Sequence, residues 1–101
     1  MKGNEYVQEF INIVGYLINS KKVPIRGDFL LVPKTIIEKM LQHNNFDTTD
    51  GKLRVWKNLH WIDCDERRMT KKVSIEGQRK RVVKLDIKVY QTLADLFKKD
   101  Y

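Results

Sequence analysis

Eight basic side chains gather between residues 67 and 84, a segment that we call the basic stretch. Glu76 is the one acidic residue within it. The charge of this stretch, 8 − 1 = +7, equals the net charge of the whole chain, +7, so the other residues balance to zero. Lysine and arginine concentrated on one folded element release counterions from a polyanion when they contact its phosphates. The stretch therefore predicts a nucleic-acid-binding surface. Its basic residues are Arg67, Arg68, Lys71, Lys72, Arg79, Lys80, Arg81 and Lys84.

The basic stretch also predicts a β-hairpin. A two-residue turn at Glu76 and Gly77 would scatter apolar residues over both faces of the hairpin. We therefore favour a three-residue loop of residues 75–77, whose last position needs a left-handed backbone that Gly77 adopts at little cost. This register directs Met69 and Val83 toward the core. It also places cations opposite one another, which destabilises a sheet, so we expect an external anion to compensate. The expected outer pairs are Arg68–Lys84, Thr70–Val82 and Lys72–Lys80, and Lys71 faces Arg81.

Different parts of the hairpin suit different contacts with DNA. Cations at a loop tip suit a narrow minor groove, whereas cations nearer the base suit phosphates and position the protein without reading sequence. The tip candidates are Gln78, Arg79, Lys80 and Arg81, and the other candidates are Arg68, Thr70, Lys71, Lys72 and Lys84. A charged edge that only resists aggregation is the plainer alternative, but eight charges exceed what edge protection needs.

A helix that begins near Thr48 or Thr49 carries a second group of candidates. Threonine can cap the free amides of a helix start, and Asp50 favours the positive end of the helix dipole. The spacing directs Leu53, Trp56 and Leu59 inward. Arginine and lysine suit guanine and asparagine suits adenine, so the base-contact candidates on this helix are Lys52, Arg54, Lys57 and Asn58. A solvated face is the alternative, and we rank this helix below the hairpin.

The remaining elements predict the fold class. Apolar spacings of three and four indicate helices over residues 4–20, 33–43 and 87–99, and Phe29–Val32 suits a short strand. The order is helix, short strand, helix, helix, β-hairpin wing and C-terminal helix. This order predicts an α+β winged helix-turn-helix domain, with the wing at about residues 67–85 and the third helix as the usual reader of the major groove.

Length and composition bound the class of protein. A chain of 101 residues fits a single domain over residues 1–101. No apolar run reaches the roughly 18 residues of a membrane span, and the first residues do not resemble a signal peptide. Cys64 is the sole cysteine, which agrees with a reducing compartment. We therefore expect a cytoplasmic protein.

Catalytic and metal-binding patterns are weak. No catalytic triad, phosphate-binding loop or paired carboxylates stand out, so we expect neither an enzyme nor a cofactor. His60 and Cys64 are too few for a metal site. The acidic residues Asp63, Asp65 and Glu66 are better explained as a local counter-charge to the basic stretch.

The first and last helices carry more apolar residues than a small core must hide. The surplus residues are Tyr6, Ile13, Tyr16, Phe97 and Tyr101. A closely wrapped monomer is one explanation. We favour a homodimer, which would place two wings on one duplex.

The segment Gly51–Ile62, followed by the hairpin Arg67–Leu85 and the helix from Ile87, resembles the small winged-helix accessory proteins of Gram-positive conjugative plasmids, of TcpK type. The resemblance implies a protein that binds double-stranded DNA at an origin of transfer and helps the relaxase complex to assemble. It implicates the wing and the third helix. A winged-helix transcriptional repressor of a mobile element and a module that binds an acidic protein partner remain alternatives.

Overall fold

The computed structural model describes residues 2–98, which form four helices and five strands. Their order is α1 (Lys2–Ser20), β1 (Ile25–Arg26), β2 (Phe29–Pro33), α2 (Lys34–Leu41), α3 (Thr49–Asn58), β3 (Ile62–Asp63), β4 (Lys71–Ile75), β5 (Gln78–Asp86) and α4 (Ile87–Lys98). This order confirms the α+β winged helix-turn-helix class. The short strands β1 and β3 were not predicted. None of the described helices has both the length and the apolar character of a membrane span.

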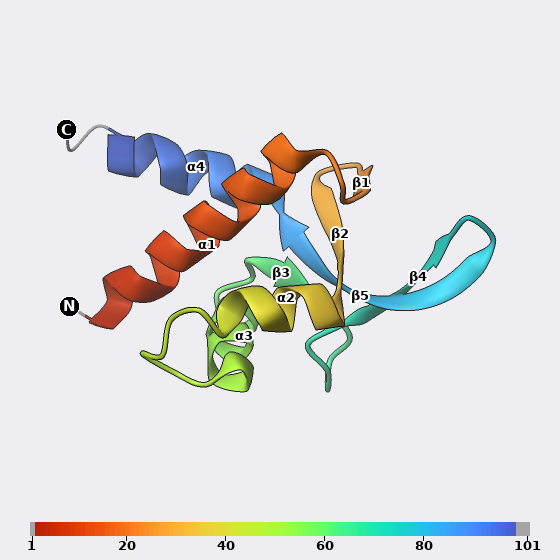
Figure 1. Ribbon diagram of the computed structural model, residues 1–101, viewed down its shortest axis with the longest axis horizontal. Helices are drawn as coiled ribbons and strands as arrows, with labels where there is room; N and C mark the ends of the chain where they lie inside the picture. Colours follow the sequence, from red (N-terminus) through yellow and green to blue (C-terminus); the bar gives the residue numbers. More distant parts are fainter. Residues whose placement is uncertain (1, 99–101) are drawn as a thin grey trace.

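Strand β5 is the centre of the sheet. β2 pairs antiparallel along one edge of β5, and β3 and β4 pair antiparallel along the other edge. Residues 64–70 form a loop between β3 and β4, so the wing proper begins at Lys71 rather than near Arg67. Figure 1 shows the wing of β4 and β5 projecting beyond the helices.

The predicted register of the wing is wrong by one residue. Ile75 lies opposite Gln78, so the turn contains only Glu76 and Gly77. Both have positive φ, 52° and 81°, which fits a type I′ turn whose twist matches that of the flanking strands. The observed pairs are Lys71–Val82, Lys72–Arg81, Val73–Lys80 and Ser74–Arg79. The pairs expected for residues 67–70 do not form, because these residues lie in the loop before β4.

The helices pack on one face of the sheet. Leu30 lies opposite Leu85, and Val32 lies opposite Val83, and all four side chains are buried in the core. The Phe10 ring of α1 packs against Trp56, with ring centroids 5.0 Å apart. The core therefore joins α1, α3 and the sheet, whereas the wing tip extends past it.

The helix-turn-helix is formed by α2 and α3. Leu53 and Trp56 are buried, as predicted, and Thr48 caps α3 by accepting a hydrogen bond from the Gly51 amide. The prediction that Leu59 faces inward is wrong, because α3 ends at Asn58 and Leu59 is 49% exposed.

The first and last helices lie side by side (Figure 1). Gly15 allows this approach, since a Cβ there would lie 3.1 Å from the Tyr90 hydroxyl. Of the apolar surplus on these helices, Ile13 is buried and Tyr6 is half-buried, so the monomer itself uses both. Tyr16 is exposed, and Tyr101 lies outside the described residues.

Candidate nucleic-acid interface

The pairing of β4 with β5 sorts the wing cations onto two faces. Residues directly opposite each other in a sheet point to the same side, and successive residues alternate. The odd-numbered residues of β5 share the side of buried Val83 and Leu85, which we call the helix-side face. The even-numbered residues point to the other side, the outer face. Lys72, Arg79 and Arg81 lie on the helix-side face, and Lys71, Lys80 and Lys84 lie on the outer face.

Two of the outer-face cations share one carboxylate within the protein. The Asp63 carboxylate lies 3.2 Å from the Lys71 ammonium and 3.0 Å from the Lys84 ammonium. Burial by itself raises the pKa of Asp63, but hydrogen bonds from Lys84 and Lys71 outweigh that effect and hold the pKa below its ordinary value. The predicted counter-charge is confirmed here, and it compensates one of the two positive charges.

The loop 64–70 holds two further candidates through its own acceptors. The Arg81 guanidinium pairs with Asp65 at 3.1 Å and donates to the Thr70 hydroxyl at 3.3 Å. Thr70 is only 4% exposed, so its assignment as a DNA contact is corrected. The Lys57 ammonium donates to the backbone carbonyls of Asp65 and Glu66. Lys57 therefore braces the loop against α3.

A groove of about 330 Å³ lies where α2, α3 and the base of the wing meet, and we call it the wing groove. Five cations line it, against two acidic residues. Arg67 and Lys34 were not among the predicted site residues, although Arg67 belongs to the basic stretch. Charged side chains lining the wing groove are Lys34, Arg54, Arg67, Arg68, Arg81, Glu38 and Asp50.

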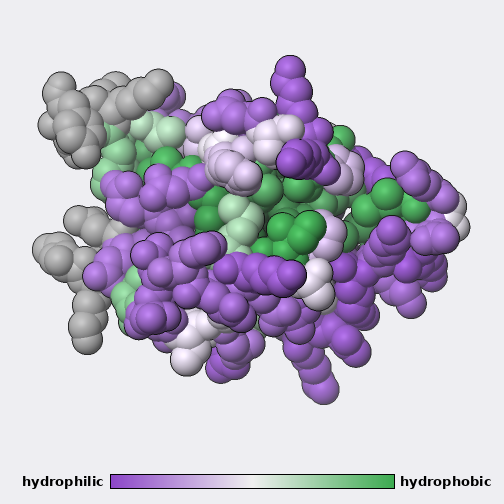
Figure 2. Space-filling model, viewed as in Figure 1, coloured by the Kyte–Doolittle hydropathy of each residue, from purple (hydrophilic) through white to green (hydrophobic). Residues whose placement is uncertain are grey.

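The wing groove and the helix-side face of the wing form one basic surface, because Arg81 belongs to both. Lys72 and Arg79 are exposed further along the wing, as are Gln78 and Lys80 near its tip. Figure 2 shows hydrophilic side chains over most of the wing. The structure thus brings Arg68, Lys72, Arg79 and Arg81 together, and separates them from Lys71, Lys80 and Lys84.

On α3, Arg54 and Asn58 are exposed and lie one turn apart. The Arg54 guanidinium pairs with Asp50 at 3.1 Å, and both side chains remain more than half exposed. Such an exposed pair is worth little, so Arg54 is free to exchange Asp50 for another acceptor. Both residues keep their place in the candidate site.

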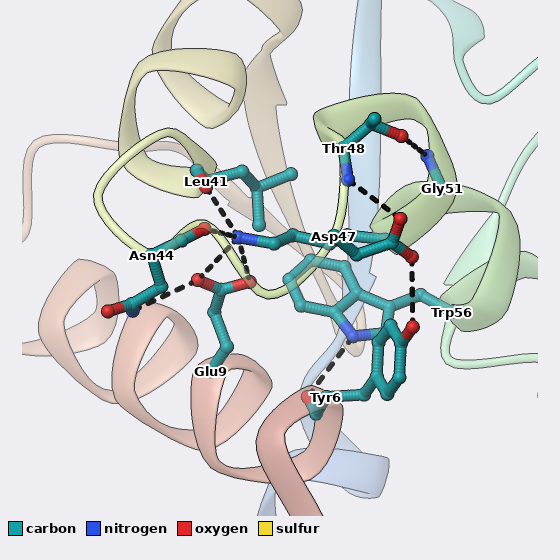
Figure 3. Close-up of polar contacts among 9 residues, drawn as sticks. Tyr6, Glu9, Leu41, Asn44, Asp47, Thr48, Gly51 and Trp56 are labelled. Atoms are coloured by element: carbon teal, nitrogen blue, oxygen red, sulfur yellow. Dashed lines mark hydrogen bonds and ion pairs between the residues drawn. The ribbon is translucent and has the colours of Figure 1, made fainter. Parts of the chain in front are cut away.

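Lys52 does not belong to the interface, which corrects its prediction as a base contact. The side chain is fully buried, and its ammonium pairs with Glu9 of α1 at 3.1 Å. It also donates to the carbonyls of Leu41 and Asn44 and lies 4.3 Å from the centroid of the Phe46 ring. Figure 3 shows Glu9, Leu41 and Asn44 converging on this ammonium. Lys52 therefore ties α3 to α1 and to the turn after α2.

A second polar contact fixes the start of α3 (Figure 3). The Asp47 carboxylate accepts hydrogen bonds from the Tyr6 hydroxyl at 2.9 Å and from the Thr48 amide at 2.7 Å. A Cβ at Gly51 would lie 2.6 Å from both oxygens of this carboxylate, so glycine is required for this approach. The Tyr6 hydrogen bond is the main cause of a lowered pKa at Asp47 and of a raised pKa at Tyr6.

Acid is expected to weaken this contact. A carboxyl whose pKa is depressed by folding stabilises the folded state above its unfolded pKa, about 3.9, and this stabilisation is lost as the pH falls through the folded pKa. Tyr6→Phe keeps the ring against Phe46 but removes the hydroxyl. We expect Tyr6→Phe to lower the denaturation midpoint at neutral pH and to reduce the further fall on acidification to about pH 3. If acidification lowered the denaturation midpoint equally in the wild type and in Tyr6→Phe, the proposed role of the Tyr6 hydroxyl would be contradicted.

The fold defines a protein of the winged helix-turn-helix class. Residues 2–91 match a family described as the Cch helix turn helix domain, and the chain belongs to that family. No curated protein matches the sequence. The family supports DNA as the partner.

Proposed function

We propose that the protein binds duplex DNA with sequence preference through one continuous surface, the helix-side face of the wing together with the wing groove. The observation that carries the proposal is that the helix-side face of the wing continues through Arg81 into the wing groove, which adds four further cations to that surface. Lys72 and Arg79 are exposed, and neither is among the residues of the ion pairs found in the described part of the chain. Arg81 pairs with Asp65 of the adjoining loop. On the outer face Lys71 and Lys84 share Asp63, and neither lysine is among the residues that line the wing groove.

The contacts divide by their position on this surface. Arg79 lies one residue after the turn-flanking Gln78 and suits insertion into a minor groove. Lys34, Arg67 and Arg68 around the wing groove suit phosphates. Arg54 and Asn58 on α3 suit base edges in the adjacent major groove, although Asp50 at the start of the helix repels phosphate. The wing supplies most of the affinity, and α3 has a supporting role.

The biological role that we propose is an accessory one in the cytoplasm at a plasmid origin of transfer, with no catalysis by the protein itself. The resemblance to TcpK-type proteins supports this role, in which a DNA-bound domain recruits the relaxase or other transfer proteins. A homodimer would place two wings on one site, and Leu96 of α4, 56% exposed, is one apolar residue that a dimer would cover.

Selection of bound sequences from a random duplex pool at about 150 mM salt tests this proposal. We expect an enriched sequence that binds at least about a hundredfold more tightly than a scrambled duplex. Its position in the parent replicon separates the roles, since an origin of transfer supports the accessory protein and a promoter supports a repressor. No enrichment would reject specific recognition and favour a surface for acidic proteins.

A further inference from the structure

A second groove lies between α1 and α2, which we call the helical groove. Its volume is about 600 Å³. Its lining runs along α1 from Glu9 to Ser20, along α2 from Ile36 to Met40, and into the following turn at His43 and Asn44. The eleven helical steps from Glu9 to Ser20 span about 16 Å, so the groove is elongated. In Figure 2 an apolar area bordered by hydrophilic side chains faces the viewer between α1, α2 and β2.

Apolar side chains form both the floor and the walls of the helical groove. Ile13 and Leu17 are nearly buried and belong to the core, so the floor is part of the rigid interior. Tyr16 and Ile36 stand at the sides with 63% and 42% of their surface exposed. Large apolar side chains exposed around one groove are typical of an interaction site.

The charge around the helical groove has one sign. Among the described residues that line it, Lys22 and Lys39 are exposed and positive. Glu9, the acidic residue of the lining, is 4% exposed and already paired with Lys52. The rim therefore favours an occupant that carries negative charge beside an apolar stripe.

We propose that the helical groove binds an acidic amphipathic helix of a partner protein. Three turns of helix match the length of the groove, with apolar residues on one stripe packing between Tyr16 and Ile36 and carboxylates near Lys22 and Lys39. A second copy of this chain is a poorer occupant, because α4 carries two lysines against one aspartate and its charge would be repelled by that rim.

The helical groove and the wing groove use different residues of α2. Ile36, Lys39 and Met40 line the helical groove, whereas Lys34 and Glu38 line the wing groove. A partner helix can therefore bind while the wing is on DNA. This arrangement allows the domain to hold a DNA site and a second protein at the same time.

The test uses a 12-residue helical peptide with leucines on one stripe and glutamates elsewhere. Two control peptides are a scrambled one of the same composition and one with lysine in place of glutamate. Each is titrated into the full-length protein without DNA, and amide chemical shifts locate the contact. We expect the striped acidic peptide alone to shift residues 12–20 and 36–43.

A charge-reversed variant makes the test specific. Lys22→Glu with Lys39→Glu is expected to lower the affinity for the striped peptide at least about tenfold. The control variant Lys80→Glu with Lys88→Glu changes the net charge equally at exposed positions away from the groove. It should change the affinity for the striped peptide by less than about twofold.

Three results would overturn the proposal. These are absence of binding, equal binding of the scrambled peptide, and shifts confined to the wing. A self-association that the Lys22 and Lys39 reversals abolish would instead assign the groove to a second copy. Because the titration contains no DNA, its outcome does not depend on the proposed DNA-binding function.

Discussion

Lys52→Met is expected to destabilise the fold by about 3–5 kcal/mol, because it leaves the Glu9 carboxylate buried without its cationic partner. The loss is a large part of the 5–15 kcal/mol that is roughly typical of a domain. Lys52 also donates hydrogen bonds to the carbonyls of Leu41 and Asn44. The variant therefore also loses the contacts that hold the turn between α2 and α3. Denaturant unfolding followed by circular dichroism measures the change.

Two further variants isolate the buried charge. Arg54→Met on the same helix removes an exposed cation and should change stability by less than about 0.5 kcal/mol. Lys52→Met combined with Glu9→Leu removes both charges, and we expect it to be more stable than Lys52→Met alone. If Lys52→Met were no more harmful than Arg54→Met, the buried ion pair would not hold the domain together.

Lys72→Gln with Arg79→Gln is expected to weaken binding to the selected duplex roughly 25-fold at about 150 mM salt. Each cation that no longer neutralises a DNA charge lowers the logarithmic salt slope by about 0.9, which corresponds to about fivefold in affinity at that salt concentration. The slope should therefore fall by about two. Fluorescence anisotropy titrations at several salt concentrations measure both quantities.

The matched control also removes two positive charges, but at positions outside the helix-side face. Lys80 is adjacent to Arg79 in sequence but points to the outer face, and Lys88 is exposed on α4. Lys80→Gln with Lys88→Gln should reduce affinity by less than about threefold. Equal losses in the two double variants would mean that DNA responds to the overall charge of the protein and not to one face.

The order of the helices and the wing could be predicted from the sequence because each depends on local signals. Helical spacing located α1, α2 and α4, and Thr48 marked the start of α3. The short strands β1 and β3 were missed because two residues carry no periodicity, and their position depends on pairing with distant strands.

The register of the wing was predicted wrongly for a physical reason. The three-residue loop was preferred because it directed apolar residues of both strands toward the core. The wing extends past the core, so that requirement does not apply to its outer half. The positive φ of both Glu76 and Gly77, typical of a type I′ turn, then sets the register.

The burial of Lys52 could have been predicted from helical spacing, but its positive charge led to its assignment as a base contact. Lys52 precedes Leu53 directly and lies four residues before Trp56, so helical spacing places it on the buried stripe. Glu9 lies in the same relation to Phe10 and Ile13 on the first helix. Opposite charges on two buried stripes indicate an internal pair. That these two helices meet depends on tertiary packing, which spacing does not reveal.

Chemical-shift mapping with the selected duplex tests most directly whether one continuous surface binds DNA. We expect the largest amide shifts in residues 49–54, 67–72 and 79–81, which belong to α3, the loop and the helix-side face of the wing. Little change is expected along α1 and α4. Shifts centred on those two helices, or on the outer face around Lys71 and Lys84, would contradict the proposed interface.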